Sequence, residues 1–166
     1  MDGASPIWRV PAERMKAGLE HIVPLSRQAV AVLRELMPLA GNSPCIFPSP
    51  GKQGIMSENT MIYALYRMGY HGRATTHGFR AIASTALNEA TRDESKLFHP
   101  DWIEMQLAHT ERNKIRGAYN RHDSAKHLPE RRRMMQWWSD TIDAIAREGE
   151  LDGSQQAAFP RAVSAE

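Results

Sequence analysis

The stretch that indicates most about the fold is Thr75-Thr76-His77-Gly78-Phe79-Arg80-Ala81-Ile82-Ala83-Ser84-Thr85-Ala86-Leu87. Its apolar side chains recur three and four residues apart, the spacing that places them on one face of an α-helix. They are Phe79, Ile82, Ala83, Ala86 and Leu87. Thr75 or Thr76 can cap the first turn, because a threonine hydroxyl accepts a hydrogen bond from a free backbone amide there. We therefore predict a helix that starts here and buries this face.

The chain before this helix begins with a predicted hairpin. Residues 8–11 and 21–24 are short runs typical of strands, and residues 12–20 between them form the predicted loop. Ser26 follows as the predicted cap of a helix that ends near Met37.

A loop and a second helix are predicted next. Residues 38–54 are rich in proline, glycine and serine, which predicts a loop around a small strand at residues 45–47. Ser57 is the predicted cap of the following helix, and Gly69 and Gly72 end it. The apolar face of that helix is formed by Met61, Ile62, Leu65 and Met68.

Three more helices are predicted after residue 90. Pro100 suits the first turn of a short helix that ends near His109. Another helix is predicted to carry Ile115 and Tyr119. A long helix follows Pro129, with Met134, Trp138, Ile142 and Ile145 at helical spacing.

The predicted fold class is therefore mainly α with a small antiparallel β-hairpin sheet. A length of 166 residues fits one domain, which we place at residues 1–147. Residues 148–166 are small, polar and acidic, and we predict a disordered tail there.

Composition excludes several classes of protein. Hydrophobic residues make up 42% and charged residues 24%, ordinary values for a soluble globular protein. No apolar run approaches the ~18 residues that cross a bilayer, and residues 1–5 do not resemble a secretory signal. The single cysteine, Cys45, excludes an internal disulfide and a cysteine zinc cluster. We accordingly predict a cytoplasmic location and no contact with a membrane.

Charge is unevenly distributed although the net charge is only +2. Residues 103–134 contain eight Lys/Arg and four Asp/Glu, whereas residues 139–166 contain two Lys/Arg and six Asp/Glu. A basic centre indicates a polyanion partner such as nucleic acid, although a solvated helix face can have the same composition.

Five side chains are candidates for chemistry, and each has an ordinary structural explanation when taken singly. They are Lys16, His77, Arg80, His109 and Tyr119. A loop lysine is usually solvated, a histidine at a helix end can cap it or interact with the helix dipole, and a helix tyrosine usually packs in the core. Only their combination favours a shared site.

Four stretches in this order resemble the tyrosine recombinase and phage integrase family, in its prophage-integrase branch. Residues 16–25, KAGLEHIVPL, resemble the family's β-hairpin, whose lysine precedes a VPL strand. Residues 76–80, THGFR, match its His-x-x-Arg box, and residues 106–109, QLAH, match its Leu-Gly-His box with Ala108 in place of glycine. Residues 118–121, AYNR, match the box that carries the nucleophile. The resemblance covers residues 8–143 and implies the family's catalytic-domain fold.

The resemblance implies a specific reaction on double-stranded DNA. Tyr119 attacks a phosphodiester and forms a phosphotyrosine link, while Lys16 protonates the leaving 5′ oxygen. Arg80 suits the non-bridging phosphate oxygens because its donors are forked. His77 and His109 donate hydrogen bonds or exchange protons. Neither a metal nor another cofactor is implied.

The resemblance also implies contacts beyond these five side chains. The basic side chains around the nucleophile are the candidates for contact with the DNA backbone: Arg112, Lys114, Arg116 and Arg121. In the family, the helix after the nucleophile often docks on a neighbouring subunit, which allows a homo-oligomer on DNA.

The sequence departs from the family pattern near its start. The family has another catalytic arginine, on a helix before the first hairpin strand, whereas here only seven residues precede Trp8 and none is an arginine. Arg9 lies on the predicted strand and is a poor substitute. We therefore expect a catalytic domain that is incomplete at its N-terminus, either a fragment, a degenerate prophage remnant or a piece cut for expression. Its activity is expected to be impaired, because losing one phosphate donor commonly lowers a rate by ~10²–10³.

Three other readings stay open at the level of sequence. The first is a DNA-binding or regulatory module without catalysis. The second is a metal-dependent phosphohydrolase, suggested by seven histidines and the pair His122-Asp123, although other ligands lack clear spacing. The third is a helical interaction domain around Trp137 and Trp138, whose spacing with Met134 favours packing into the core instead.

Overall fold

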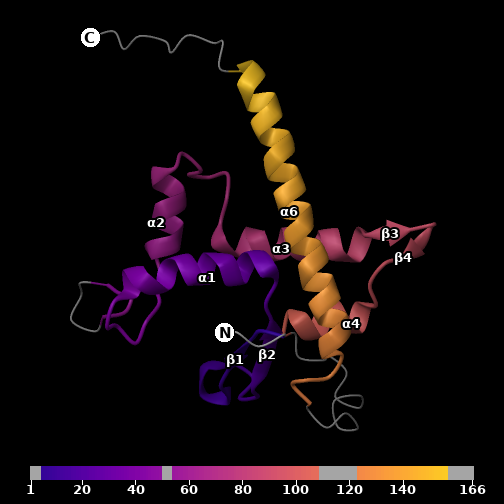
Figure 1. The fold of residues 1–166 in the computed structure, drawn as a ribbon, viewed down its shortest axis with the longest axis horizontal. Coiled ribbons are helices and arrows are strands. Elements are labelled where there is room, and N and C mark those ends of the chain that lie inside the picture. Colours follow the sequence, from indigo (N-terminus) through magenta and orange to yellow (C-terminus); the bar gives the residue numbers. More distant parts are fainter. Residues whose placement is uncertain (1–4, 50–53, 109–122, 157–166) are drawn as a thin grey trace.

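This computed structural model describes residues 5–49, 54–108 and 123–156, and the side chains among them up to residue 149. Figure 1 shows a long C-terminal helix, α6, that crosses two shorter helices, α3 and α4, with a small hairpin near its N-terminal end. Helix α1 runs across the molecule beside them, and α2 stands above the end of α1 that is distant from α6 (Figure 1). The predicted class, mainly α with a small antiparallel sheet, is confirmed.

The hairpin consists of β1 (Ile7–Val10) and β2 (His21–Pro24). The strands are antiparallel, with Arg9 opposite Ile22, so the predicted hairpin is confirmed. Helix α1 (Arg27–Ala40) follows, and the Ser26 hydroxyl accepts a hydrogen bond from the backbone N–H of Ala29 at 3.2 Å. Such a cap contributes ~1 kcal/mol, because it satisfies one of the free amides of the first turn.

Residues 45–47 do not form the small strand that the sequence predicted. The structure has bends at these residues and an isolated bridge between Pro48 and Ile55. Pro44 and Pro48 flank the apolar residues, and a proline has no backbone N–H to donate to a ladder. The proposed strand was therefore wrong.

Helix α2 (Thr60–Arg67) begins after Asn59, not after the predicted cap Ser57. The Ser57 hydroxyl lies 3.2 Å from the Thr60 hydroxyl, so it contacts the first turn through a side chain. Leu65 is buried on this helix, as the apolar pattern predicted. Met61 and Met68 are exposed, so only part of that face is covered among the described residues.

Helix α3 (Thr76–Glu89) follows the stretch with the strongest helical pattern. Leu87 is buried and Ala83 and Ala86 are half-buried, but Phe79 and Ile82 are exposed. The prediction that these last two side chains are buried was wrong. The core that contains Leu87 lies at the C-terminal end of α3, and the first turns of the helix extend beyond it.

A second hairpin, which the sequence analysis did not predict, connects α3 to α4. Its strands are β3 (Thr91–Arg92) and β4 (Ser95–Lys96), and helix α4 (Pro100–Gln106) follows. Pro100 stands in the first turn of α4, as predicted.

Helix α6 (Leu128–Gln156) contacts α1, α3, α4 and β2, and thereby organises the core. The buried core consists of Leu87, Phe98, Ile103, Leu107 and Met134. Trp137 and Trp138 are partly buried against it, which supports the core-packing interpretation of the two tryptophans. The helix runs past residue 147, where the sequence placed the end of the domain, and that boundary stays a prediction.

Candidate functional site

Helix α3 positions two of the five candidate side chains. The Thr75 hydroxyl accepts a hydrogen bond from the Gly78 backbone N–H at 3.0 Å, which fixes the first turn at Thr76. His77 and Arg80 stand three residues apart on this helix, so they lie on the same side of it. Both are exposed, as a residue must be to contact a DNA phosphate.

Arg80 reaches the end of α4. A terminal nitrogen of its guanidinium, Nη2, donates a hydrogen bond to the backbone carbonyl of Leu107. The last carbonyls of a helix have no partner within the helix, so a cation there is favoured by both hydrogen bonding and the helix dipole. Leu107 is itself buried in the core. The His-x-x-Arg box and the start of the Leu-Ala-His box therefore meet in the structure.

Ala108 adopts a backbone conformation that alanine rarely occupies. Its φ is 51°, in the left-handed region, and it directly follows Leu107, the C-cap residue of α4. A glycine at this position accommodates positive φ without a Cβ clash, which gives a physical reason for the glycine of the family's box. The chain turns sharply here, just before His109.

Lys16 lies at an exposed turn between β1 and β2. A short 3₁₀ turn (Ala12–Arg14) precedes it, and the Gly18 backbone N–H donates to the Met15 carbonyl at 2.9 Å, which closes a tight turn around Lys16. The side chain is exposed, as expected of a proton donor that must reach a DNA oxygen.

The hairpin that carries Lys16 is hydrogen-bonded to Ser124, which follows Tyr119 in the sequence. Arg9 pairs with Glu20 across the hairpin, with Nη1 at 2.7 and 2.8 Å from the two carboxylate oxygens. The Ser124 hydroxyl donates to one of these oxygens, Glu20 Oε2, at 3.0 Å. Ser124 follows the nucleophile box by a few residues, so this bond connects two predicted parts of the site.

Arg131 contacts both the β1–β2 hairpin and Ser124. It is fully buried on the first turns of α6, and it donates to Gln106 Oε1 at 3.1 Å and to the Ser124 carbonyl at 3.2 Å. Its Nη2 also donates to the Ile22 carbonyl in β2. Burial removes water from the guanidinium and lowers the pKa of Arg131 to about 10, so the side chain remains charged at neutral pH.

The remaining candidates lie outside the described residues. These are His109 and Tyr119, together with the predicted DNA-contacting residues Arg112, Lys114, Arg116 and Arg121. The structure thus places Lys16, His77 and Arg80, and it brings Arg80 to the end of α4. That all five side chains converge on one phosphate stays a prediction.

Sequence reasoning missed Arg131 because it belongs to the run Arg131-Arg132-Arg133, which looked like a solvated basic face. A usable signal was present nonetheless. Arg131 stands three residues before Met134 and seven before Trp138, so it shares their apolar face on the helix. An arginine on such a face is buried or nearly so, and therefore needs specific partners.

The described residues contain no group of three or more histidine, cysteine, aspartate or glutamate side chains placed to hold a metal ion. Within the same residues, no helix is long and apolar enough to cross a membrane.

Comparison with known proteins identifies the family. The model of the phage integrase family matches residues 1–126. The prophage integrase IntA of Escherichia coli K12 is 47% identical over 138 residues, which cover 82% of this chain and 31% of that protein. The integrase of Enterobacteria phage P4 is 43% identical over 152 residues, which cover 82% of this chain and 33% of that protein.

A third relative, the prophage integrase IntZ of Escherichia coli K12, is 46% identical over 136 residues, which cover 82% of this chain and 32% of that protein. The chain thus spans about a third of the length of the curated relatives it matches. No solved structure matches it significantly. With four motifs in order, a mainly helical fold and a family match over most of its length, the chain belongs to the phage integrase family, in the prophage-integrase branch of the tyrosine recombinases.

Proposed function

We propose that this chain carries the DNA-cleaving chemistry of site-specific recombination, with Tyr119 as the nucleophile. The observation that best supports the proposal is the hydrogen bond from Arg80 to the Leu107 carbonyl. It joins the His-x-x-Arg box to the chain that leads into His109, although Arg80 and Leu107 are 27 residues apart. Since a guanidinium has five N–H donors, a bond to one carbonyl leaves others for a phosphate.

The proposed reaction is a transfer of the phosphoryl group from DNA to the enzyme. The phenolic oxygen of Tyr119 attacks phosphorus, a new phosphorus–tyrosine bond forms, and the bond to the 5′ oxygen breaks. The phenolic proton passes to a histidine of the site, and Lys16 supplies a proton to the leaving 5′ oxygen. Arg80 and the histidines stabilise charge on the non-bridging oxygens. The 3′-phosphotyrosyl link retains the phosphodiester energy, so rejoining requires no nucleotide cofactor.

The proposed partner is double-stranded DNA, held by basic side chains around the nucleophile: Arg112, Lys114, Arg116 and Arg121. Such phosphate contacts give binding that weakens steeply as salt is raised, because each contact releases condensed counterions. On DNA we further propose a homo-oligomer of this chain.

Cleavage by the 166-residue polypeptide alone is proposed to be slow. None of the four motifs in it carries the family's other catalytic arginine, and one missing charge-stabilising donor commonly costs ~10²–10³ in rate. The experiment must therefore accumulate the covalent product instead of measuring turnover.

A nicked suicide substrate achieves this, because the short 5′ fragment diffuses away and cannot rejoin. Wild type should accumulate a covalent protein–DNA adduct, and Tyr119→Phe should form none, since it keeps the ring but lacks the attacking oxygen. Tyr66→Phe is the matched control: Tyr66 is exposed on α2 and its ring lies 4.3 Å from that of His71. This variant should form the adduct at the wild-type rate.

Two results would reject the proposal. An adduct that survives Tyr119→Phe would mean that another residue is the nucleophile. Salt-sensitive DNA binding without an adduct in any variant, even after long incubation, would favour the non-catalytic DNA-binding module instead.

A further inference from the structure

Arg131 is the one buried charged side chain among the described residues, and it donates to three neutral oxygens: Gln106 Oε1, the Ser124 carbonyl and the Ile22 carbonyl. Burying a guanidinium is costly, and these acceptors do not provide the attraction of a carboxylate. The planar guanidinium instead fixes the directions of its N–H donors, so that one side chain reaches three different segments at once.

The three acceptors lie in three segments that the proposed chemistry needs. Gln106 is the last residue of α4 and precedes the segment with His109 and Tyr119. Ser124 follows that segment, and Ile22 is in β2 of the hairpin that carries Lys16. One side chain thus connects both flanks of the nucleophile segment to the hairpin of the predicted proton donor.

Ser124 is held from two directions, which strengthens this reading. Its carbonyl accepts from Arg131, and its hydroxyl donates to Glu20, which Arg9 holds across the hairpin. Neither neighbour of Arg131 in the arginine run has the same role. Arg132 donates to the Pro6 carbonyl at 3.1 Å, and Arg133 is exposed and lies 3.6 Å from Glu130.

We propose that Arg131 is a positioning residue for DNA cleavage, which holds Gln106 and Ser124, on either side of the nucleophile segment, against β2 of the hairpin that carries Lys16. The inference rests on the proposed function, since it assigns a role within the same reaction. An error of about 1 Å in the placement of reacting groups can cost ~10²-fold in rate, so a remote side chain that sets this distance has a large effect.

The test compares Arg131→Met with Arg132→Met. Both variants lose one positive charge at adjacent positions of α6, so their weak binding to DNA should fall equally and slightly. At saturating suicide substrate, Arg131→Met should form the covalent adduct about 10²-fold more slowly than wild type. Arg132→Met should stay within about threefold of wild type, because it contacts neither flank of the nucleophile segment.

Hydrogen exchange provides a readout that is independent of cleavage. The Leu107 backbone N–H donates to the Ile103 carbonyl at 2.9 Å, and the Lys126 N–H donates to the Asp123 carbonyl at 3.0 Å. Both amides should exchange faster in Arg131→Met. The Val30 amide, which donates to the Ser26 carbonyl at 3.0 Å, should not change. Unchanged exchange at Leu107 and Lys126 would overturn the proposal. Faster exchange at all three amides would indicate general loss of structure, and a milder variant at Gln106 then decides.

A milder variant covers the case in which Arg131→Met does not fold. Gln106→Met removes one of the three acceptors and leaves the other two in place, so it should lower the adduct rate about tenfold, as expected for one hydrogen bond to a charged group. Gln106→Glu keeps an acceptor and should retain nearly the wild-type rate. Equal rates for Gln106→Met and wild type would overturn the proposal.

The outcomes also separate this proposal from the proposed function. If wild type forms no adduct, the proposed function fails, and exchange at Leu107 and Lys126 still decides whether Arg131 holds the two flanks. If wild type forms the adduct and Arg131→Met slows it no more than Arg132→Met does, the proposed function stands and the role of Arg131 is rejected.

Discussion

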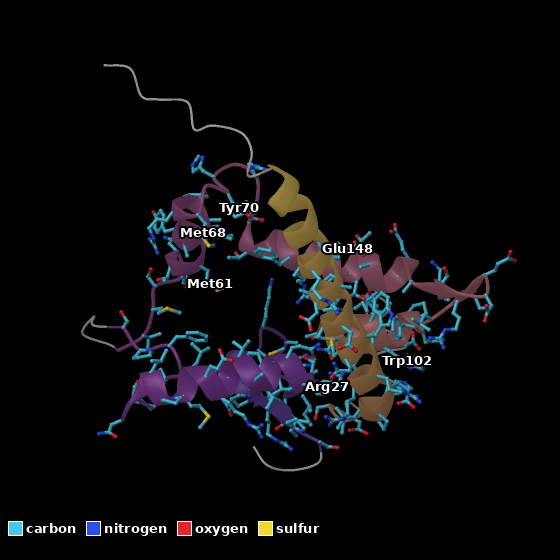
Figure 2. All side chains as sticks on the ribbon, turned by 45° about the horizontal axis from the view of Figure 1, so that its top comes forward. Arg27, Met61, Met68, Tyr70, Trp102 and Glu148 are labelled. Carbon is cyan, nitrogen blue, oxygen red and sulfur yellow. The ribbon has the colours of Figure 1, made fainter. Side chains whose placement is uncertain are left out.

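Two regions of this molecule are built in different ways. At the packed end, where α3, α4 and β2 meet α6, Ile103 is 1% exposed and Met134 is fully buried. On the open side, formed by α2 and the outer face of α1, Met61 is 61% exposed and Leu39 is 78% exposed. Figure 2 shows the same contrast, with side chains crowded around α6 near Trp102 and sparse around Met61 and Met68.

The predicted chemistry depends on the packed end. Arg80 reaches the Leu107 carbonyl there, and Arg131 connects α4, β2 and Ser124 there. A close-packed region transmits small displacements, because its side chains cannot move independently. Changes at the packed end should therefore affect both stability and the site, whereas changes on the open side should affect neither strongly.

The largest expected effect is on stability, and it compares two methionines. Met134→Ala removes a fully buried side chain from the core and should lower the free energy of unfolding by about 2–5 kcal/mol, from lost apolar burial and the cavity left behind. Met61→Ala, at an exposed position of α2, should change it by no more than ~0.5 kcal/mol. Denaturant unfolding measures both. Equal effects of the two substitutions would remove the distinction between the regions.

The next effect is on cleavage, and it compares two arginines that are replaced by lysine. Arg80→Lys keeps the charge but loses the fork that matches phosphate oxygens, so adduct formation should slow by ~10²–10³. Arg67→Lys, at the exposed end of α2, should leave the rate unchanged. The rate of adduct formation on the nicked substrate measures both. A similar loss in the two variants would mean that the effect does not depend on the position of Arg80, and no loss in either would mean that a positive charge alone is sufficient there.

The sequence predicted local features, such as helix caps, more accurately than it predicted which helix faces are buried. The caps at Ser26 and Thr75 depend on residues three positions apart, and both were confirmed. Helical periodicity identified a shared face on α3 but could not show whether another element covers it, so Phe79 and Ile82 were wrongly expected in the core. The hairpin β3–β4 was missed because two-residue strands leave almost no pattern.

The site was predicted unevenly for a similar reason. Motifs predicted Lys16, His77 and Arg80 as site residues, because their residue types suit the chemistry directly, and these roles stay predictions. Arg131 and Ser124 contact segments far away in sequence, Arg131 at Ile22 and Ser124 at Glu20, and no motif indicates such contacts. The roles of His109 and Tyr119 stay predictions, since both lie outside the described residues.

The smallest expected effect compares one residue from each region that has positive φ. Ala108 lies two residues after the end of α4 and has a φ of 51°, and Gly69 follows α2 at a φ of 86° with no atom within 4 Å of an added Cβ. A left-handed conformation costs an L-residue with a Cβ about 1–2 kcal/mol, whereas glycine loses roughly 0.4–1 kcal/mol more backbone entropy on folding. Ala108→Gly should therefore raise the free energy of unfolding by about 0.5–1 kcal/mol, and Gly69→Ala should lower it by a similar amount.

Because backbone strain is local, the two changes should be similar in size although one region is packed and the other open. Denaturant unfolding of both variants measures this. If Ala108→Gly instead destabilised the protein, contacts of the alanine methyl group at the packed end would outweigh the strain, and the contrast between the regions would extend even to the backbone.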